Sequence, residues 1–269
     1  MRMEGVKQNI THSNGGLKRL AYLVVSLVGG ILLWGLLTRI LRLPAFILPG
    51  PGLVWRRFLQ SLGDGQLLYH TLTTLYEVVV GLLIGSFTAT SLGYLLAKST
   101  TLEKLLSPYL VASQSIPIVA IAPLLVIWFG PGIFSKILIC SLIVFFPVLI
   151  NTVVGLREVP QDLRDLMRTL KATPFQTFWK LEVPAALPIY LGGLRVGATL
   201  SVIGAVVGEL VGADRGLGFL INVGRGQYDT ALVFVAVLTL ILKAMVLYGL
   251  VLLIEARLLS WQSWRHEAH

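Results

Sequence analysis

The sequence predicts an all-α protein that crosses a membrane about six times. Hydrophobic residues make up 55% of its 269 residues, charged residues make up only 13%, and the mean hydropathy is +0.81. This composition leaves too few polar side chains to cover a domain surrounded by water. A spanning helix needs about 20 apolar residues, so the length suits about six spans and no large domain outside the membrane. We therefore do not expect an enzyme with a catalytic or metal site.

Six apolar runs are long enough to span the bilayer. They occupy residues 20–38, 71–97, 105–129, 137–155, 189–211 and 231–254. The first run follows a basic stretch and has no small-residue cleavage site behind it, so we expect a retained anchor helix and not a signal peptide. The runs predict one membrane domain, 20–259, between two short tails, 1–19 and 260–269.

Basic residues indicate which side each loop faces. The chain has 22 Lys and Arg against 13 Asp and Glu, and in a membrane protein such a surplus sets orientation more often than it binds nucleic acid. Lys and Arg are most frequent in the two tails and in the segments 98–104 and 157–180. Both termini and the long loop 156–188 are therefore expected in the cytoplasm. The single cysteine, Cys140, excludes an internal disulfide.

An amphipathic helix is expected between the first two spans. It follows the rigid turn Leu48-Pro49-Gly50-Pro51, and its apolar face consists of Val54, Trp55, Phe58, Leu59 and Leu62. Arg56 and Arg57 lie on its other face. The helix either rests in the outer membrane interface or offers a docking surface to an external partner.

The cytoplasmic loop 156–188 is expected to contain two short helices. Thr173, Pro174 and Gln176 fit an N-cap, an N1 proline and an N3 partner, which together form a capping box. This helix should stop before Pro184, because a proline ring clashes with the preceding helical turn. Phe175, Phe178 and Trp179 would share one face. They either pack on the protein's own spans or enter an apolar groove of a partner.

The same loop resembles the EAA signature of ABC-importer permeases, E-A-A-x3-G-x9-I-x-L-P. The acidic, aliphatic and proline positions correspond to Asp165, Leu181, Val183 and Pro184. Leu166 and Met167 replace the two alanines, and Lys171 replaces the glycine that lets two short helices turn. This replacement puts the sharpness of the turn in question.

The resemblance covers nearly the whole chain and points to the nitrate, sulfonate, taurine and bicarbonate permease group. It is carried by Leu48-Pro49-Gly50-Pro51, Gln114-Ser115-Ile116-Pro117, Ala122-Pro123-Leu124, Trp128-Phe129-Gly130, Gly208-Glu209 and Gly216-Leu217-Gly218. The segment that begins at Gly212-Ala213-Asp214 is similar to permeases for thiamine-pyrimidine or riboflavin precursors.

The resemblance implies a permease of the type I ABC-importer architecture in a bacterial inner membrane. Such a subunit pairs with a second copy of itself, receives a small solute from an external binding protein and is driven by separate ATPase subunits that carry the ATP and magnesium. The sequence holds no G-x-x-x-x-G-K-[ST] phosphate loop. The EAA positions and the three aromatics imply that the loop couples to the ATPase, through Asp165, Thr173, Pro174, Phe175, Phe178, Trp179, Leu181 and Pro184.

Ionisable residues inside spans are costly and are candidates for function. Arg195 and Glu209 lie near opposite ends of one predicted span, where each either lines a pathway or anchors at an interface. Lys243 lies in the middle of the last span. By depth it should not reach Glu209, so a backbone carbonyl, another span or a cavity must satisfy it.

The third span is interrupted by Pro108, Pro117 and Pro123, and free carbonyls at membrane depth are tolerated only when they are buried or face a watery cavity. The polar residues beside this break predict a translocation pathway, completed by two of the charged residues. The set is Ser113, Gln114, Ser115, Glu209 and Lys243.

Two other functions remain open from the residues alone. A secondary transporter would couple solute to protons through Glu77, Glu209 or Lys243, and a membrane scaffold would use the cytoplasmic helix without transport. Metal chemistry is not expected, because His70 has no second ligand at metal spacing and the other histidines lie in the tails.

Overall fold

The computed structural model describes residues 15–42 and 44–260 of the chain, without the side chains of 15–21 and 23. Most of the predicted tails, 1–19 and 260–269, and the three tail histidines therefore lie outside the described residues. The described ranges contain helices and no β-strand. This confirms the predicted all-α class.

Twelve helical segments follow one another along the described chain. They are α1 (Gly15–Ile40), α2 (Pro51–Gly63), α3 (Gln66–Lys98), α4 (Thr100–Gln114), α5 (Ile118–Phe129), α6 (Ile133–Arg157), α7 (Gln161–Thr169), α8 (Pro174–Thr177), the π-helix η1 (Phe178–Glu182), α9 (Val183–Leu210), α10 (Leu217–Gly226) and α11 (Thr230–Leu258).

The six predicted spans correspond to α1, α3, the pair α4 and α5, α6, α9 and α11. In the described residues, four helical segments are long and apolar enough to cross a membrane, namely α3, α6, α11 and the continuous stretch Pro174–Leu210. The pair α4 and α5 counts as a fifth if it is one broken span, since it bends by 93°. In α1 the described apolar stretch, Val24–Ile40, is shorter.

Helices α3, α6 and α9 form the centre of the molecule, and small residues let them approach closely. A Cβ added to Gly85 of α3 would lie 2.6 Å from the carbonyl oxygen of Ser141, and one added to Gly204 of α9 would lie 2.9 Å from Cα of Cys140. Backbone contact of this kind is how helices pack in lipid, where apolar surface gives no drive to associate. Both glycines are therefore needed for the packing.

Proline explains the break between α4 and α5. Helix α4 ends at Gln114 with Ser115 as its C-cap, and Pro117 lies at the N-cap of α5, where its missing N–H removes no helical hydrogen bond. The predicted interruption of the third span is thus confirmed at Pro117. Pro108 and Pro123 lie inside α4 and α5 without ending them.

Helix α10 is an element that the sequence analysis does not predict. It is only 10 residues long and lies between α9 and α11 on the chain. It starts after Gly216, whose φ of +107° is a conformation that side chains rarely adopt. A short helix of this kind is below the length that an apolar run must have to be read as a span.

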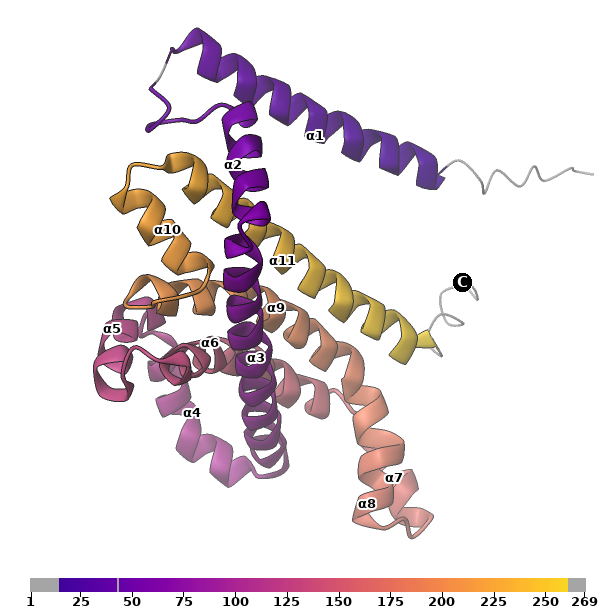
Figure 1. Ribbon diagram of the computed structural model, residues 1–269. Coiled ribbons are helices and arrows are strands. Elements are labelled where there is room, and N and C mark those ends of the chain that lie inside the picture. Colours follow the sequence, from indigo (N-terminus) through magenta and orange to yellow (C-terminus); the bar gives the residue numbers. More distant parts are fainter. Residues whose placement is uncertain (1–14, 43, 261–269) are drawn as a thin grey trace, which may run out of the picture.

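Different helices and connections lie at the two ends of the molecule (Figure 1). Helices α7 and α8, the start of α1 and the end of α11 lie toward one end, at the right of the view. The connection between α1 and α2, together with α5 and α10, lies toward the other end. The loop that contains α7 and α8 and the chain ends of the described part are thus on one side, the arrangement expected for an even number of spans.

Candidate functional site

Asp165, at the acidic position of the EAA-like segment, lies on α7 with its side chain 56% exposed. Its carboxylate accepts hydrogen bonds from the guanidinium of Arg168 at 2.9 Å and from the side-chain amide of Gln161 at 3.2 Å. Exposed pairs within one helix contribute little stability. Asp165 is therefore held in place on α7 but remains open to a partner.

Lys171, at the motif's glycine position, adopts the left-handed conformation that glycine favours, with a φ of 53°. The N–H of Lys171 donates to the carbonyl of Arg168, and the N–H of Ala172 donates to the carbonyl of Met167, both at 2.9 Å. This is a Schellman motif with Lys171 at C′. The turn between α7 and α8 is therefore as sharp as a glycine would make it.

The predicted capping box is present at the start of α8. The hydroxyl of Thr173 accepts from the N–H of Gln176 at 3.2 Å, and the N–H of Thr173 donates to the side-chain carbonyl of Gln176 at 2.9 Å. Pro174 occupies the first helical turn, where its missing N–H costs nothing. The sequence alone thus fixes where α8 begins.

The prediction that this helix stops before Pro184 is wrong. Helical structure continues from Pro174 to Leu210, because η1 widens the turn in front of the proline. The N–H of Val183 donates to the carbonyl of Phe178, five residues back, in place of the α-helical partner four residues back. The wider turn relieves the clash that a proline ring makes in a regular helix.

The three aromatics form one cluster, as predicted, but they are not equally free. The Trp179 ring lies 6.2 Å from that of Phe175 and 5.3 Å from that of Phe178, measured between centroids. Phe175 is 72% exposed and Trp179 is 54% exposed. Phe178 is half-buried and packs edge-on against Tyr94 of α3 at 5.2 Å. Phe178 thus packs on the protein's own spans, as one interpretation expected, whereas Phe175 and Trp179 are left exposed.

An apolar cavity of about 730 Å³ adjoins this cluster. It lies between α3, the end of α6 and the first turns of α9, and its lining includes Phe87, Leu156, Phe178 and Tyr190. Leu181 of η1 is half-buried on the same segment. The segment formed by α8 and η1 is therefore not packed against the bundle along its whole length.

Glu182, between two motif positions, is the main functional candidate that the sequence analysis misses. Its side chain is 1% exposed and accepts from Lys98 at the end of α3 and from Arg164 of α7, the latter at 3.2 Å. Arg164 also donates to the backbone carbonyl of Leu156 at 2.7 Å. The signal available in the sequence was a single acidic residue inside an aliphatic and proline-rich stretch.

The predicted pathway residues at the break between α4 and α5 all have exposed side chains. The hydroxyl of Ser113 donates to the carbonyl of Tyr109 at 2.7 Å, and that of Ser115 donates to the carbonyl of Val111 at 3.3 Å. Gln114 is the last residue of α4. These side chains point away from the chain's own core, which suits contact with a solute or with a second copy.

Glu209, the fourth predicted pathway residue, lies in a different place. It is fully buried, accepts from the hydroxyl of Thr74 at 2.6 Å and from the N–H of Gly218 at 2.5 Å, and so caps the start of α10. A carboxylate at a helix N-terminus satisfies free N–H groups and complements the helix dipole. Its contacts are those of a structural cap, and its role in a pathway stays a prediction.

Two further side chains of α3 complete this cap. The hydroxyl of Thr74 accepts from the N–H of Leu217 at 2.9 Å, and Nδ1 of His70 accepts from the N–H of Gly216 at 3.0 Å. Each of the three backbone N–H groups at the start of α10 thus has a side-chain partner. Helix α3 and helix α10 are joined by these bonds near the end of the molecule opposite α8.

Lys243 is satisfied by a backbone carbonyl, one of the three possibilities that the sequence left open. Its amino group donates to the carbonyl of Thr71 on α3 at 2.9 Å. Among the described residues no ion pair within 4 Å joins it to Glu209. The two residues are not separated by depth as predicted, because Lys243 binds Thr71 and Glu209 binds Thr74, one turn apart on α3. Arg195 pairs with Glu255 of α11 at 3.1 Å. Both cations therefore brace neighbouring helices in this chain.

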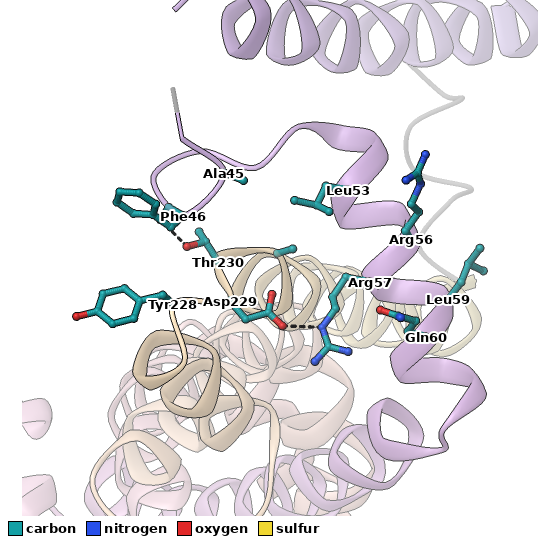
Figure 2. Close-up of a pocket in the computed structure, with 11 residues that line it drawn as sticks. Ala45, Phe46, Leu53, Arg56, Arg57, Leu59, Gln60, Tyr228, Asp229 and Thr230 are labelled. Atoms are coloured by element: carbon teal, nitrogen blue, oxygen red, sulfur yellow. Dashed lines mark hydrogen bonds and ion pairs between the residues drawn. The ribbon is translucent and has the colours of Figure 1, made fainter. Parts of the chain in front are cut away.

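A second pocket of about 730 Å³ lies at the opposite end, between α2 and the connection from α10 to α11 (Figure 2). Across it Arg57 of α2 donates to Asp229 at 2.7 Å, and the other oxygen of Asp229 accepts from the N–H of Leu232 at the start of α11. Tyr228, beside it, is 79% exposed with a φ of 57°.

The predicted amphipathic helix is present as α2, and the protein covers only part of its apolar face. Val54 is buried and Phe58 half-buried, whereas three other apolar residues of the predicted face are exposed. These are Trp55, Leu59 and Leu62. Arg57, predicted on the other face, instead points toward the protein and pairs with Asp229.

Comparison with known proteins identifies the family. Residues 81–260 match the family described as "Binding-protein-dependent transport system inner membrane component". The chain is 46% identical over 220 residues to the riboflavin transport system permease protein RibX of Chloroflexus aurantiacus, a match that covers 82% of each chain. It is 34% identical to the formylaminopyrimidine transport permease protein ThiX of Halalkalibacterium halodurans, covering 86% of this chain and 92% of that one.

A more distant relative and a solved structure agree with this result. The taurine transport system permease protein TauC of Escherichia coli is 32% identical over 77% of this chain and 78% of its own. The fold is similar to an inward-facing conformation of the MetNI methionine ABC transporter, with a TM-score of 0.62 and 21% identity over 70% of this chain and 94% of that chain. The chain therefore belongs to the binding-protein-dependent transport system inner membrane components and is the permease subunit of an ABC transporter.

Proposed function

We propose that α8 is the helix through which a cytoplasmic ATPase drives this permease. The observation that carries the proposal is the exposed pair Phe175 and Trp179 on a helix with a fixed start, beside an apolar cavity and at the end of the molecule where the loop 157–180 is rich in basic residues. Exposed aromatics on a rigid helix are suited to a partner's groove. Asp165 lies exposed on the neighbouring α7 and is available to the same partner.

ATP and magnesium are then bound on separate ATPase chains. This chain has no phosphate-binding loop motif, so the energy has to arrive through a mechanical contact. The cytoplasm would lie on the side of α8 and of the chain ends, as the positive-inside rule requires. The ion-coupled secondary transporter and the scaffold are set aside by the family to which the chain belongs.

The translocation pathway is proposed to run between two copies of this chain, along the break between α4 and α5. Gln114 and the two neighbouring serines are exposed there, on a helix pair that bends by 93° at membrane depth. Irregular backbone inside a membrane has to be covered by protein or face water. A second copy and a watery pathway would supply both.

The opposite end of the molecule is proposed to receive the solute-binding protein. Exposed Trp55 and Leu59 of α2, together with the pocket around Arg57 and Asp229, form a surface there that no other part of the described chain covers. Such a surface, part apolar and part charged, resembles protein interfaces in composition. This favours the docking interpretation of α2.

The solute is proposed to be a heteroaromatic vitamin or vitamin precursor, such as riboflavin or a thiamine pyrimidine. The relatives named for riboflavin and formylaminopyrimidine transport are 46% and 34% identical, against 32% for the taurine permease. In such systems part of the selectivity resides in the external binding protein, so the permease alone indicates a class and not a single compound.

Reconstitution tests this function. The chain, its ATPase and its binding protein would be placed in liposomes, and uptake of riboflavin, a formylaminopyrimidine and taurine would be measured with ATP inside. We expect ATP-dependent uptake of one of the two heteroaromatic solutes. Uptake of taurine alone would overturn the solute class, and uptake that is independent of the ATPase would overturn the coupling.

A further inference from the structure

Two side-chain contacts join the C-terminal end of α3 to η1, the turn that follows α8. Tyr94 packs edge-on against Phe178, with ring centroids 5.2 Å apart, and Lys98 pairs with Glu182. Residues 94 and 98 are one helical turn apart on α3, and 178 and 182 bound η1. Lys98 also lies over the Tyr94 ring at 5.5 Å. We call these four residues the bracket.

The polar contact is a buried ion pair in which Lys98 and Arg164 both reach Oε1 of Glu182, while Oε2 has no hydrogen-bond partner among the described residues. Glu182 is 1% exposed, and its carboxylate meets Lys98 and Arg164, which are 40% and 24% exposed. A buried carboxylate is tolerated only with such partners, and removing them leaves an uncompensated charge. Arg164 continues the contact to the last turn of α6 through the carbonyl of Leu156.

The four bracket residues are important because α8 and η1 are not packed against α3 along their whole length. The cavity of about 730 Å³ lies against α3, α8 and η1. The connection from α8 to α9 passes through the widened π-turn and Pro184, where regular α-helical hydrogen bonds are interrupted. The bracket thus fastens the two ends of this irregular turn directly to α3, so that the turn is held by a helix other than α9.

The far end of α3 is also fastened to a neighbour. His70 and Thr74 accept hydrogen bonds from the N-terminal N–H groups of α10. Helix α3 is a single helix from Gln66 to Lys98, so a displacement at one end is carried to the other. The contacts give a continuous route from α8 through α3 to α10.

We infer that the bracket transmits the movement of the coupling helix to α3, with Glu182 as the positioning residue that sets the direction of α8. The inference rests on the proposed role of α8 as the contact with the ATPase. It adds that α3, in addition to the directly connected α9, is moved by the ATPase.

The test replaces Glu182 in the full complex of permease, ATPase and binding protein in liposomes. Glu182→Gln keeps the shape but removes the charge that holds Lys98 and Arg164. We expect normal assembly with the ATPase, because Phe175 and Trp179 remain, together with a drop of about tenfold in solute taken up per ATP hydrolysed. Glu182→Asp keeps the charge, and we expect it to restore part of this ratio.

Glu103→Gln is the matched control. Glu103 pairs with Arg157 and joins α4 to α6 at the same end of the molecule, but it does not touch η1. We expect its ratio of uptake to hydrolysis to stay within about twofold of wild type, which is the scatter of a surface pair. A similar loss in both variants would show a general weakening of this end and would overturn the role of the bracket.

A second variant keeps the inference open to refutation if Glu182→Gln fails to fold. Lys98→Met removes the bond to α3 but leaves Arg164 to compensate the buried charge of Glu182, and the same drop in the ratio is expected. Assembled complexes of either variant with the wild-type ratio would overturn the inference alone. Solute uptake by wild-type permease and binding protein in liposomes that contain no ATPase would overturn the proposed function instead. The two failures are therefore distinguishable.

Discussion

Lys171 occupies a left-handed position that disfavours a side chain. Such a conformation costs a residue other than glycine roughly 1 kcal/mol. We expect Lys171→Gly to raise the thermal unfolding midpoint of the permease in detergent. The gain in unfolding free energy should be at most about 1 kcal/mol, because glycine also increases the conformational entropy of the unfolded chain. Transport should be unchanged, because the turn keeps its shape.

The control for this change is Lys104→Gly, on the exposed side of α4. There the backbone is helical and glycine is destabilising by about 1 kcal/mol, so the unfolding midpoint should fall. The two lysine-to-glycine changes are thus expected to act with opposite sign. A decrease for Lys171→Gly would show that its side chain makes a contact more valuable than the relief of strain.

Phe175 and Trp179 are the aromatics that carry the proposed contact with the ATPase. Truncating either to Ala removes a large apolar anchor, and such anchors cost about 2 kcal/mol or more, roughly thirtyfold in affinity. We expect normal membrane insertion, weakened co-purification with the ATPase and loss of solute-stimulated ATP hydrolysis. Co-purification and hydrolysis would be measured on the same preparations.

Tyr22→Ala provides the comparison for these aromatics. Tyr22 is 74% exposed near the start of α1, toward the same end of the molecule as α8. It should bind the ATPase like wild type. If Phe175→Ala and Trp179→Ala bind the ATPase normally but aggregate when they are extracted from the membrane, these rings belong to the protein's own core and the coupling assignment is wrong.

At the scale of elements, the start of α10 depends on its side-chain cap. Glu209→Ala leaves the N–H of Gly218 without its partner in a buried place, at a cost of about 1 to 3 kcal/mol. We expect a lower unfolding midpoint and reduced yield of the folded permease. Asp214→Ala, in the exposed connection that precedes α10, should leave the midpoint unchanged.

The same variant separates the two interpretations of Glu209. If its main role is the cap, uptake should fall in proportion to the amount of folded protein. If Glu209→Ala keeps its stability and yet loses uptake, the residue lines the pathway as the sequence analysis predicted. Solute uptake normalised to folded permease therefore decides between them.

Much of the element order could be predicted because the bilayer imposes a simple rule. Long apolar runs predicted the spans, Pro117 predicted the break in the third one, and Thr173 with Gln176 predicted the start of α8. These signals are local. Each depends on residues within one or two helical turns, and no distant contact is needed to satisfy them.

The features that could not be predicted depend on contacts between distant residues or on a compromise in the backbone. Helix α10 is too short for a span and is held by His70 and Thr74, which precede it by more than 140 positions. Glu182 meets Lys98 across 84 positions. The clash of a proline ring with the preceding helical turn predicted a helix end before Pro184, but the π-helix η1 relieves this clash and lets the helix continue.

At the scale of the whole molecule, the uncovered apolar surface of α4 and α5 indicates a missing neighbour. Tyr109, Val119, Ile127 and Trp128 are each at least 60% exposed on this broken pair. Lipid could cover their side chains, but it cannot satisfy the backbone at the break. A second copy of the chain would cover the break and would place two sets of polar residues opposite each other.

Cross-linking tests this arrangement directly. The only native cysteine, Cys140, is fully buried, so a Ser115→Cys variant presents one reactive thiol at the break. In membranes treated with a mild oxidant, we expect a disulfide between two copies that runs as a dimer on a denaturing gel and disappears on reduction. A two-fold axis beside the break brings each residue near its own copy, which makes this pairing possible.

Leu83→Cys is the control for random collision, because Leu83 lies on α3 and is 64% exposed. If dimers formed only by diffusion in the membrane, both thiols would cross-link at similar rates. A dimer from Ser115→Cys alone places the break at the symmetry axis, where a pathway between two copies has to run. Equal cross-linking of both variants, or none at residue 115 in the assembled complex with its ATPase, would move the pathway away from α4 and α5.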